Sequence, residues 1–379
     1  MDARITADDT GTPLDNTLVN QADLLQAYLG WGTKNFFDTG LSMDIKGGRQ
    51  TIDLGSRRLV ARNVFRNTIN AFTGLDAQIG APNDWLVHSF YVLPVFRLPD
   101  QVEDIRDGKT VFDQEDIGTR FWGVHGRKDQ MPWITHGELY ILGLHEEDAE
   151  DLSTRNRRLY TPGIRWFKDP AKGQMDFEIE AAYQTGTSHA STRATDTQDL
   201  DHTAHFEHAQ IGYTFDLPWS PRFLAQYDYA SGDDDPNDGD NNRFDTLYGA
   251  RRWELGPTGI WGELARANIN SPGYRLFVKP REDVSAFIAH RMIWLASDRD
   301  AWTTTPLTTE GALQDPTGQS GDFVGHQIES SIGWTVIPKN LMLEAGWAYL
   351  IKGEFARNAP GAPNEGDTNY FYVQTLLQF

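Results

Sequence analysis

The sequence predicts an all-β protein, an antiparallel transmembrane β-barrel formed by residues 1–379 as a single outer-membrane domain. Three observations support this fold class. Apolar and polar residues alternate with a period of two along most of the chain, the connections between these segments are short and long in turn, and the last residue is the aromatic Phe379. A period of two is typical of strands that face lipid on one side and water on the other.

The composition agrees with a barrel and excludes several other classes. Mean hydropathy is −0.52, and no apolar run reaches the roughly 18 residues of a membrane-spanning helix. Barrel strands keep hydropathy low because half of their residues are polar. The absence of cysteine excludes a disulfide scaffold and cysteine metal sites. A formal net charge of −20 and a pI near 4.8 argue against nucleic acid as a partner.

The alternation is clearest where apolar Phe177 and Ile179 are interleaved with acidic Asp176, Glu178 and Glu180. One face of such a strand suits lipid and the other water, so these acids are expected to face the lumen. Strands are expected at 23–32, 40–50, 67–79, 85–97, 117–128, 136–146, 159–168, 174–187, 203–217, 221–231, 269–279, 283–297, 324–337, 340–352 and 368–379.

The connections favour a barrel over a soluble sandwich. Short ones, such as GAPND and IPKN, alternate with long ones along the whole chain. This parity is typical of outer-membrane barrels, which have short periplasmic turns and long extracellular loops. The long connections are 51–66, 98–116, 147–158, 188–202, 232–268, 298–323 and 353–367.

The two ends of the chain bear on the strand count. Along residues 368–379 one face carries Phe371, Val373, Thr375, Leu377 and the terminal Phe379, which resembles the terminal strand by which outer-membrane barrels are recognised for assembly. Asp2–Ala7 can supply the end of an ascending strand, which makes about 16 strands visible, and a complete barrel would have about 18. The first residues have neither the basic start nor the apolar core of a signal peptide. The chain is therefore expected to lack N-terminal strands and its signal peptide.

A basic segment stands out in this acidic chain. Residues 49–66 contain five arginines and one acid, Asp53. A solvated basic loop is one interpretation. The other is a segment that folds into a pore and contacts anions. Strict alternation from Ile45 would point Arg49 toward lipid, so only a β-bulge at Gly47–Gly48 would turn it inward.

Several segments resemble the core of the alginate export family, outer-membrane porins that secrete alginate. They are GRQTIDLGSRRLVARNVFRNTINAF from residue 48, YDYASGD from 227, RFDTLYGARRWELGPTGIWGELARANINSPGYRLFVKP from 243, HRMIWLASDRDAW from 290 and SGDFVGHQIESSIGWTVIPKNLMLEAGWAYLIKGEF from 320. The resemblance spans Asp23 to Phe379 in the same order. It implies a large antiparallel barrel whose arginine-rich lumen passes an anionic polysaccharide.

The resemblance also implies which basic residues line the pore. A guanidinium binds a carboxylate bidentately and stays charged at any relevant pH, so arginines suit a polyuronate that carries one carboxylate per sugar. Rings of basic side chains are the usual selectivity device of anion pores. The expected pore-lining residues are Arg49, Arg57, Arg58, Arg62, Arg66, Arg251, Arg252, Arg266, Arg275, Lys279 and Arg291.

A second interpretation applies to the basic residues after 250. They lie among Asp245, Glu254, Glu263 and Glu282, so some of them could form ion pairs that hold a long loop against the barrel wall. Both roles can coexist, because lumenal acids such as Asp228 can position arginines.

No cofactor, metal site or catalytic residue is expected. The acidic run 231–242 offers oxygen ligands for calcium, but it departs from the EF-hand pattern at Pro236, and a solvated acidic loop is the preferred interpretation. His205 and His208 would point to opposite faces of one strand, which argues against a shared metal. No nucleophile elbow or phosphate-binding loop occurs.

The leading hypothesis is a porin in the bacterial outer membrane that passes anionic polysaccharide or oligosaccharide. Its expected partners are this substrate, outer-membrane lipid and periplasmic secretion proteins, and not nucleic acid. The alternatives are an outer-membrane enzyme acting on polysaccharide or lipid, a small-anion uptake channel, and a structural barrel with a plugged lumen. Substrate identity and direction of transport stay open.

Overall fold

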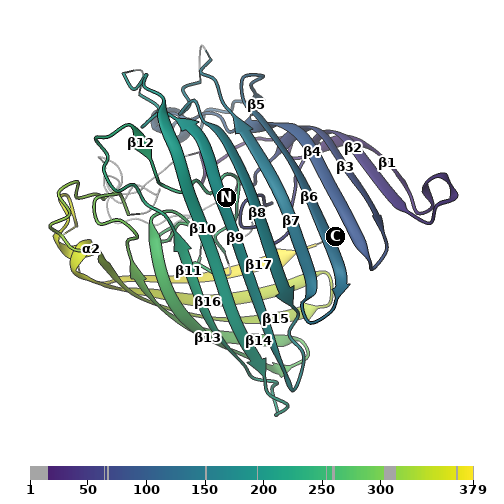
Figure 1. Ribbon diagram of the computed structural model, residues 1–379. Helices are drawn as coiled ribbons and strands as arrows, with labels where there is room; N and C mark the ends of the chain where they lie inside the picture. Colours follow the sequence, from purple (N-terminus) through teal and green to yellow (C-terminus); the bar gives the residue numbers. More distant parts are fainter. Residues whose placement is uncertain are drawn as a thin grey trace.

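The computed structural model describes residues 16–63, 65, 68–149, 152–193, 195–252, 254–257, 261–302, 313–363 and 366–378. Seventeen strands and three short helices are assigned in this part of the chain. The strands form one curved antiparallel sheet that wraps around several long connections (Figure 1). The prediction of an all-β barrel fold is confirmed.

The elements follow one another along the chain with little helix. The strands are β1 (Ala27–Thr33), β2 (Ser42–Gln50), β3 (Phe72–Ala81), β4 (Trp85–Phe96), β5 (Gln114–Glu115), β6 (Arg120–Met131), β7 (Thr135–His145), β8 (Arg158–Lys168), β9 (Gln174–Ser188), β10 (Leu200–Thr214), β11 (Arg222–Ala230), β12 (Asp240–Asn241), β13 (Ile269–Arg281), β14 (Val284–Trp294), β15 (Phe323–Ile337), β16 (Leu341–Lys352) and β17 (Thr368–Leu377). The helices are η1 (Phe36–Asp38), α1 (Val102–Arg106) and α2 (Glu354–Asn358).

Consecutive long strands pair antiparallel in an up-and-down order, from β1 with β2 to β16 with β17. The two-residue strands are additions to this order, since β5 extends the edge of β4 and β12 runs parallel to β10. Each of the fifteen predicted strand ranges corresponds to one long strand. Within the described residues β1 pairs only with β2 and β17 only with β16, so the sheet is not closed. The strand expected at Asp2–Ala7 lies outside these residues.

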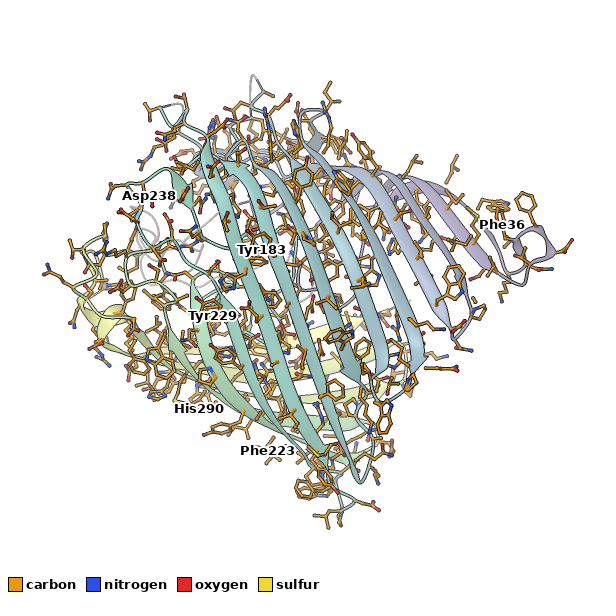
Figure 2. All side chains as sticks on the ribbon, viewed as in Figure 1. Phe36, Tyr183, Phe223, Tyr229, Asp238 and His290 are labelled. Carbon is orange, nitrogen blue, oxygen red and sulfur yellow. The ribbon has the colours of Figure 1, made fainter. Side chains whose placement is uncertain are left out.

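Alternation along the strands separates an apolar outer face from a polar inner face. On β9, Asp176, Glu178 and Glu180 are buried, whereas Ile179 and Tyr183 are about half exposed. Figure 2 shows Tyr183 of β9 and Phe223 of β11 on the outer surface of the sheet. The predicted lumen-facing acids therefore do face inward. No helix among the described residues is long and apolar enough to cross a membrane.

The hydrophobic core lies inside the curve of the sheet and contains residues from the long connections. Leu59 and Val60, which follow β2, and Phe244 and Leu255, which follow β11, pack in one cluster with Phe121 and other inward residues of the strands. The enclosed space is thus partly filled by folded loops. These loops carry most of the predicted site residues.

Candidate functional site

Two long connections meet inside the sheet. We call residues 51–71 the first inner loop and residues 231–268 the second inner loop. Two backbone hydrogen bonds hold the loops side by side. The Tyr248 N–H donates to the Leu59 carbonyl oxygen at 3.0 Å, and the Ala61 N–H donates to the Tyr248 carbonyl oxygen at 3.1 Å. The Asn70 side chain donates to the same Tyr248 oxygen at 3.0 Å. Residues far apart in the sequence are thereby fixed in one place.

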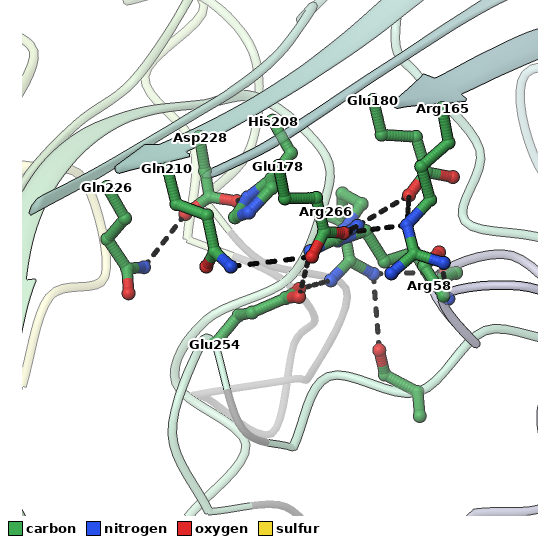
Figure 3. Close-up of polar contacts among 12 residues, drawn as sticks. Arg58, Arg165, Glu178, Glu180, His208, Gln210, Gln226, Asp228, Glu254 and Arg266 are labelled. Atoms are coloured by element: carbon green, nitrogen blue, oxygen red, sulfur yellow. Dashed lines mark hydrogen bonds and ion pairs between the residues drawn. The ribbon is translucent and has the colours of Figure 1, made fainter. Parts of the chain in front are cut away.

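Arg58 projects from the first inner loop onto the inner face of β9. Its guanidinium contacts Glu178, Glu180 and Glu254, the Glu180 contact being 2.5 Å long (Figure 3). The Arg58 side chain is only 3% exposed. Burial alone would lower the pKa of Arg58, but the three carboxylates raise it well above its usual value. Arg58 is therefore a permanent cation inside the lumen.

Glu254 of the second inner loop accepts hydrogen bonds from four arginines. Its carboxylate binds Arg58 and, at 2.6 Å, Arg266. Its backbone carbonyl oxygen accepts from Arg275 of β13 and, at 2.9 Å, from Arg291 of β14. We call Arg58, Arg266, Arg275 and Arg291 the four-arginine cluster. Burial would raise the pKa of the Glu254 carboxyl, but the arginines around it lower that pKa, so Glu254 is ionised.

Arg252 joins the second inner loop to the last strands of the sheet. It donates to Glu329 of β15 at 2.7 Å, and to Glu344 of β16 and the Tyr372 hydroxyl of β17 at 3.0 Å each. Its guanidinium also lies over the ring of Phe65, 5.2 Å from the ring centroid. The alternative expected from the sequence, ion pairs that hold this loop against the wall, describes Arg252, whereas Arg266 pairs with Glu254 of the same loop.

Arg291 and His208 share the carboxylate of Asp228 on β11. Arg291 donates to one Asp228 oxygen at 2.8 Å, and His208 Nδ1 lies 2.7 Å from the other. His208 is fully buried, whereas His205, three residues before it, has a half-exposed side chain. The prediction that these two histidines point to opposite faces is confirmed.

One group of side chains has the composition of a metal site. Ligand atoms of His208, Asp228 and Glu254 lie within 4.8 Å of one another. Both carboxylates, however, already neutralise guanidinium groups, with Arg291 on Asp228 and Arg58 and Arg266 on Glu254. A divalent cation at this point would be repelled by three buried positive charges. The arrangement is suited to anions rather than to metals.

The other predicted pore residues lie in different surroundings. Arg57 forms an ion pair with Asp53 of the same loop at 3.0 Å, and Arg62 is exposed beside it. Arg251 donates to backbone carbonyl oxygens of its own loop at 3.3 Å. Lys279 is exposed near the short turn after β13, where it pairs with Glu282 at 2.7 Å. Arg66 lies outside the described residues.

The expectation that Arg49 lines the pore is corrected by the strand pairing. β2 pairs residue for residue with β1 and β3 through Gly47 and Gly48, so no bulge turns the strand. Arg49 lies opposite Thr73, on the face that also carries exposed Leu75. It is held there by Glu115 at 2.7 Å and Asp23 at 3.1 Å. Strict alternation placed this arginine correctly on the outer face.

Sequence reasoning missed several inward residues. Arg165 on β8 donates to Glu178 at 2.8 Å and to Glu138 of β7 at 3.1 Å. Arg222 on β11 pairs with Asp176. The outward position of Trp166 was a signal that could have identified Arg165, because neighbours on a strand point to opposite faces.

Comparison with known proteins supports the porin interpretation. A family model described as alginate export matches residues 1–368. No curated protein sequence matches the chain.

Solved outer-membrane proteins have a similar fold at low sequence identity. The structure of Pseudomonas aeruginosa OpdK with vanillate matches with a TM-score of 0.52 and 11% identity, over 88% of this chain and 76% of OpdK. P. aeruginosa OccK2 (OpdF) matches with a TM-score of 0.49 and 12% identity, over 89% of this chain and 80% of OccK2. Acinetobacter baumannii OccAB1 matches with a TM-score of 0.48 and 13% identity, over 89% of this chain and 74% of OccAB1.

Proposed function

Because the chain belongs to the alginate export family and is an outer-membrane porin, we propose that its lumen passes anionic polysaccharide or oligosaccharide of the polyuronate type. The observation that carries this proposal is the four-arginine cluster. It places four guanidinium groups around one carboxylate-bearing residue, Glu254, inside the curve of the sheet.

The chemistry of the cluster suits a uronate. A guanidinium presents parallel N–H donors that match the two oxygens of a carboxylate. Arg58 and Arg266 already bind one carboxylate together, with Arg58 at one oxygen of Glu254 and Arg266 at the other. Arg252 presents a further guanidinium to the inner face of β15 and β16. Several such groups along one path supply successive sites for a polymer with one carboxylate per sugar.

The lumenal acids keep these sites weak. Glu178, Glu180 and Asp228 occupy the same guanidinium groups that a substrate would use. A passing carboxylate therefore exchanges with a protein carboxylate and is not trapped. Conduction needs binding that is favourable enough for entry and weak enough for exit. We propose that the protein transports its substrate without catalysing a reaction, because an arginine binds each of these carboxylates.

A second candidate is a channel for small carboxylates. The observation that favours it is the position of the two inner loops, which are held inside the sheet by Arg58 and Arg252. A polymer would have to displace these loops further than a small molecule would. OpdK, which has a similar fold, was solved with vanillate.

Ion-selectivity and blocking measurements in planar bilayers test both candidates. We expect the purified protein to be anion-selective in a KCl gradient, and alginate oligomers added to one side to interrupt the current for times that lengthen with oligomer length. Interruption by glucuronate but not by oligomers would support the small-carboxylate channel. Cation selectivity would contradict both.

A further inference from the structure

We infer that the four-arginine cluster is the binding site for a single sugar carboxylate, and that Glu254 is its built-in competitor. This inference rests on the proposed function and adds to it the site where one carboxylate is recognised. In the structure the Glu254 carboxylate occupies Arg58 and Arg266, and the Glu254 carbonyl oxygen occupies Arg275 and Arg291. A substrate carboxylate binds by taking the place of Glu254.

The convergence of the cluster supports a binding site rather than a set of chance ion pairs. Its four arginines come from four separate segments, the two inner loops, β13 and β14, and all meet at Glu254. Their residues are between 1% and 6% exposed. Burying four guanidinium groups together is costly unless an acceptor is present. Such a cluster therefore requires an anion at its centre.

Two members of the cluster depend on Glu254. Arg58 also pairs with Glu178 and Glu180, and Arg291 also pairs with Asp228. By contrast, the only described carboxylate that Arg266 contacts is that of Glu254, and Arg275 donates to the Glu254 carbonyl oxygen.

The cluster also has donors to spare. The Nε atoms of Arg58 and Arg266 are buried and have no hydrogen-bond partner among the described residues. An unsatisfied buried donor costs about 1–3 kcal/mol. A ligand that carries hydroxyl oxygens beside its carboxylate, as a uronic acid does, can satisfy donors that Glu254 leaves unused.

Glu254 is the part of the site nearest to water. Its side chain is 18% exposed, whereas those of Arg58 and Arg266 are 3% and 1% exposed. Solvent therefore reaches the Glu254 side chain more than the two guanidinium groups that it binds. An incoming carboxylate can approach from that side as Glu254 withdraws with its loop.

A tethered competitor lowers the apparent affinity for a free ligand. A group fixed beside its own site acts at an effective concentration in the millimolar range or above. The apparent affinity of the free ligand equals its intrinsic affinity multiplied by the fraction of time that the site is vacant. Removing the Glu254 carboxylate should therefore strengthen the binding of a free sugar carboxylate.

The test compares Glu254→Gln and Glu254→Ala with the unmodified protein, using sodium glucuronate as the probe in single-channel recordings. We expect both variants to bind glucuronate at least about tenfold more tightly, seen as longer current interruptions at lower concentrations. Glu254→Gln keeps the size of the side chain. If the alanine variant does not fold, the glucuronate affinity of Glu254→Gln alone tests the inference. Folding is checked by the heat-dependent migration of the barrel on gels.

Glu263→Gln is the matched control. Glu263 lies on the same inner loop, and the substitution is chemically the same, but no arginine among the described residues binds Glu263. We expect glucuronate affinity to change by less than about twofold in this variant, because its charge acts only at a distance.

The possible outcomes separate this inference from the proposed function. Unchanged glucuronate affinity in folded Glu254 variants of an anion-selective channel would overturn the inference alone. Larger conductance without tighter glucuronate binding would overturn it too, since Glu254 would then only hold the loop. A cation-selective unmodified channel would overturn the proposed function itself.

Discussion

Arg252 and Glu329 form a buried ion pair 2.7 Å long, with side chains 1% and 2% exposed, between the second inner loop and β15. The same guanidinium reaches Glu344 of β16 at 3.0 Å. One loop residue thus holds the loop against two strands of the wall. Breaking a buried pair on one side leaves an uncompensated charge, which costs more than losing an exposed pair.

The first prediction concerns this contact. Arg252→Ala should destabilise the folded loop by roughly 3–5 kcal/mol, because Glu329 and Glu344 stay buried without their cation. The loop should leave the wall, and single-channel conductance and current noise should rise. Lys279→Ala is the control, because its partner Glu282 is fully exposed and surface pairs contribute little. Conductance equal to that of the control variant would show that Arg252 does not hold the loop.

The second prediction concerns Arg58. A unit positive charge attracts an anion that passes at a distance of about 4 Å by about 1 kcal/mol even in bulk water. This energy corresponds to a change of about fivefold in anion permeability. Arg58→Ala removes this charge and frees Glu178 and Glu180, so the anion-to-cation permeability ratio should fall by about fivefold or more. Reversal potentials in a KCl gradient measure the ratio.

The same substitution on the outer face provides the control for Arg58. Arg49→Ala should leave the reversal potential unchanged, because Arg49 pairs with Glu115 away from the lumen. The half-buried Arg57 and the exposed Arg62 should have smaller effects on the reversal potential than Arg58, and these effects should shrink at high salt. A larger effect from Arg49 than from Arg58 would contradict the inner and outer faces described for the sheet.

The third prediction tests the pairing of the two inner loops. A Cβ atom added at Gly249 would lie 1.7 Å from the Arg58 carbonyl oxygen, which is backbone and cannot rotate away. Gly249→Ala should therefore separate the loops and expose them to limited proteolysis while the strands stay folded. Gly239→Ala is the control, since an added Cβ there has nothing within 4 Å. Equal proteolysis of both variants would argue against the loop pairing.

The strands were predictable from the sequence because lipid and water impose opposite demands on alternate residues. Phe177 and Glu178 show this directly, since each is stable on only one face of β9. The inward position of the acids on β9 followed from the same alternation. The alternation also placed Arg49 on the outer face, and the prediction that Arg49 lines the pore was wrong because it assumed a bulge at two glycines that overrode the pattern.

The partners of the site residues could not be predicted in the same way. Arg58 and Glu254 are 196 positions apart, and they meet because two loops pair through Leu59 and Tyr248. Loop residues have no period that fixes their direction. The sequence therefore indicated that basic residues enter the lumen, but not that Glu254 lies at their centre.

The last prediction concerns pH and Glu263. Burial raises the pKa of the Glu263 carboxyl from 4.5 to about 7, with Lys352 opposing the shift. The folded protein thus holds this proton more tightly than the unfolded chain, so the associated stabilisation is complete below about pH 4.5 and is lost as the pH rises through about 7. Above this value the second inner loop gains a negative charge, and anion selectivity should fall. Reversal potentials measured across this pH range should show a transition with a midpoint near pH 7. This transition should disappear in Glu263→Gln. A transition that persists in this variant would assign the titration to another group, such as a lumenal histidine.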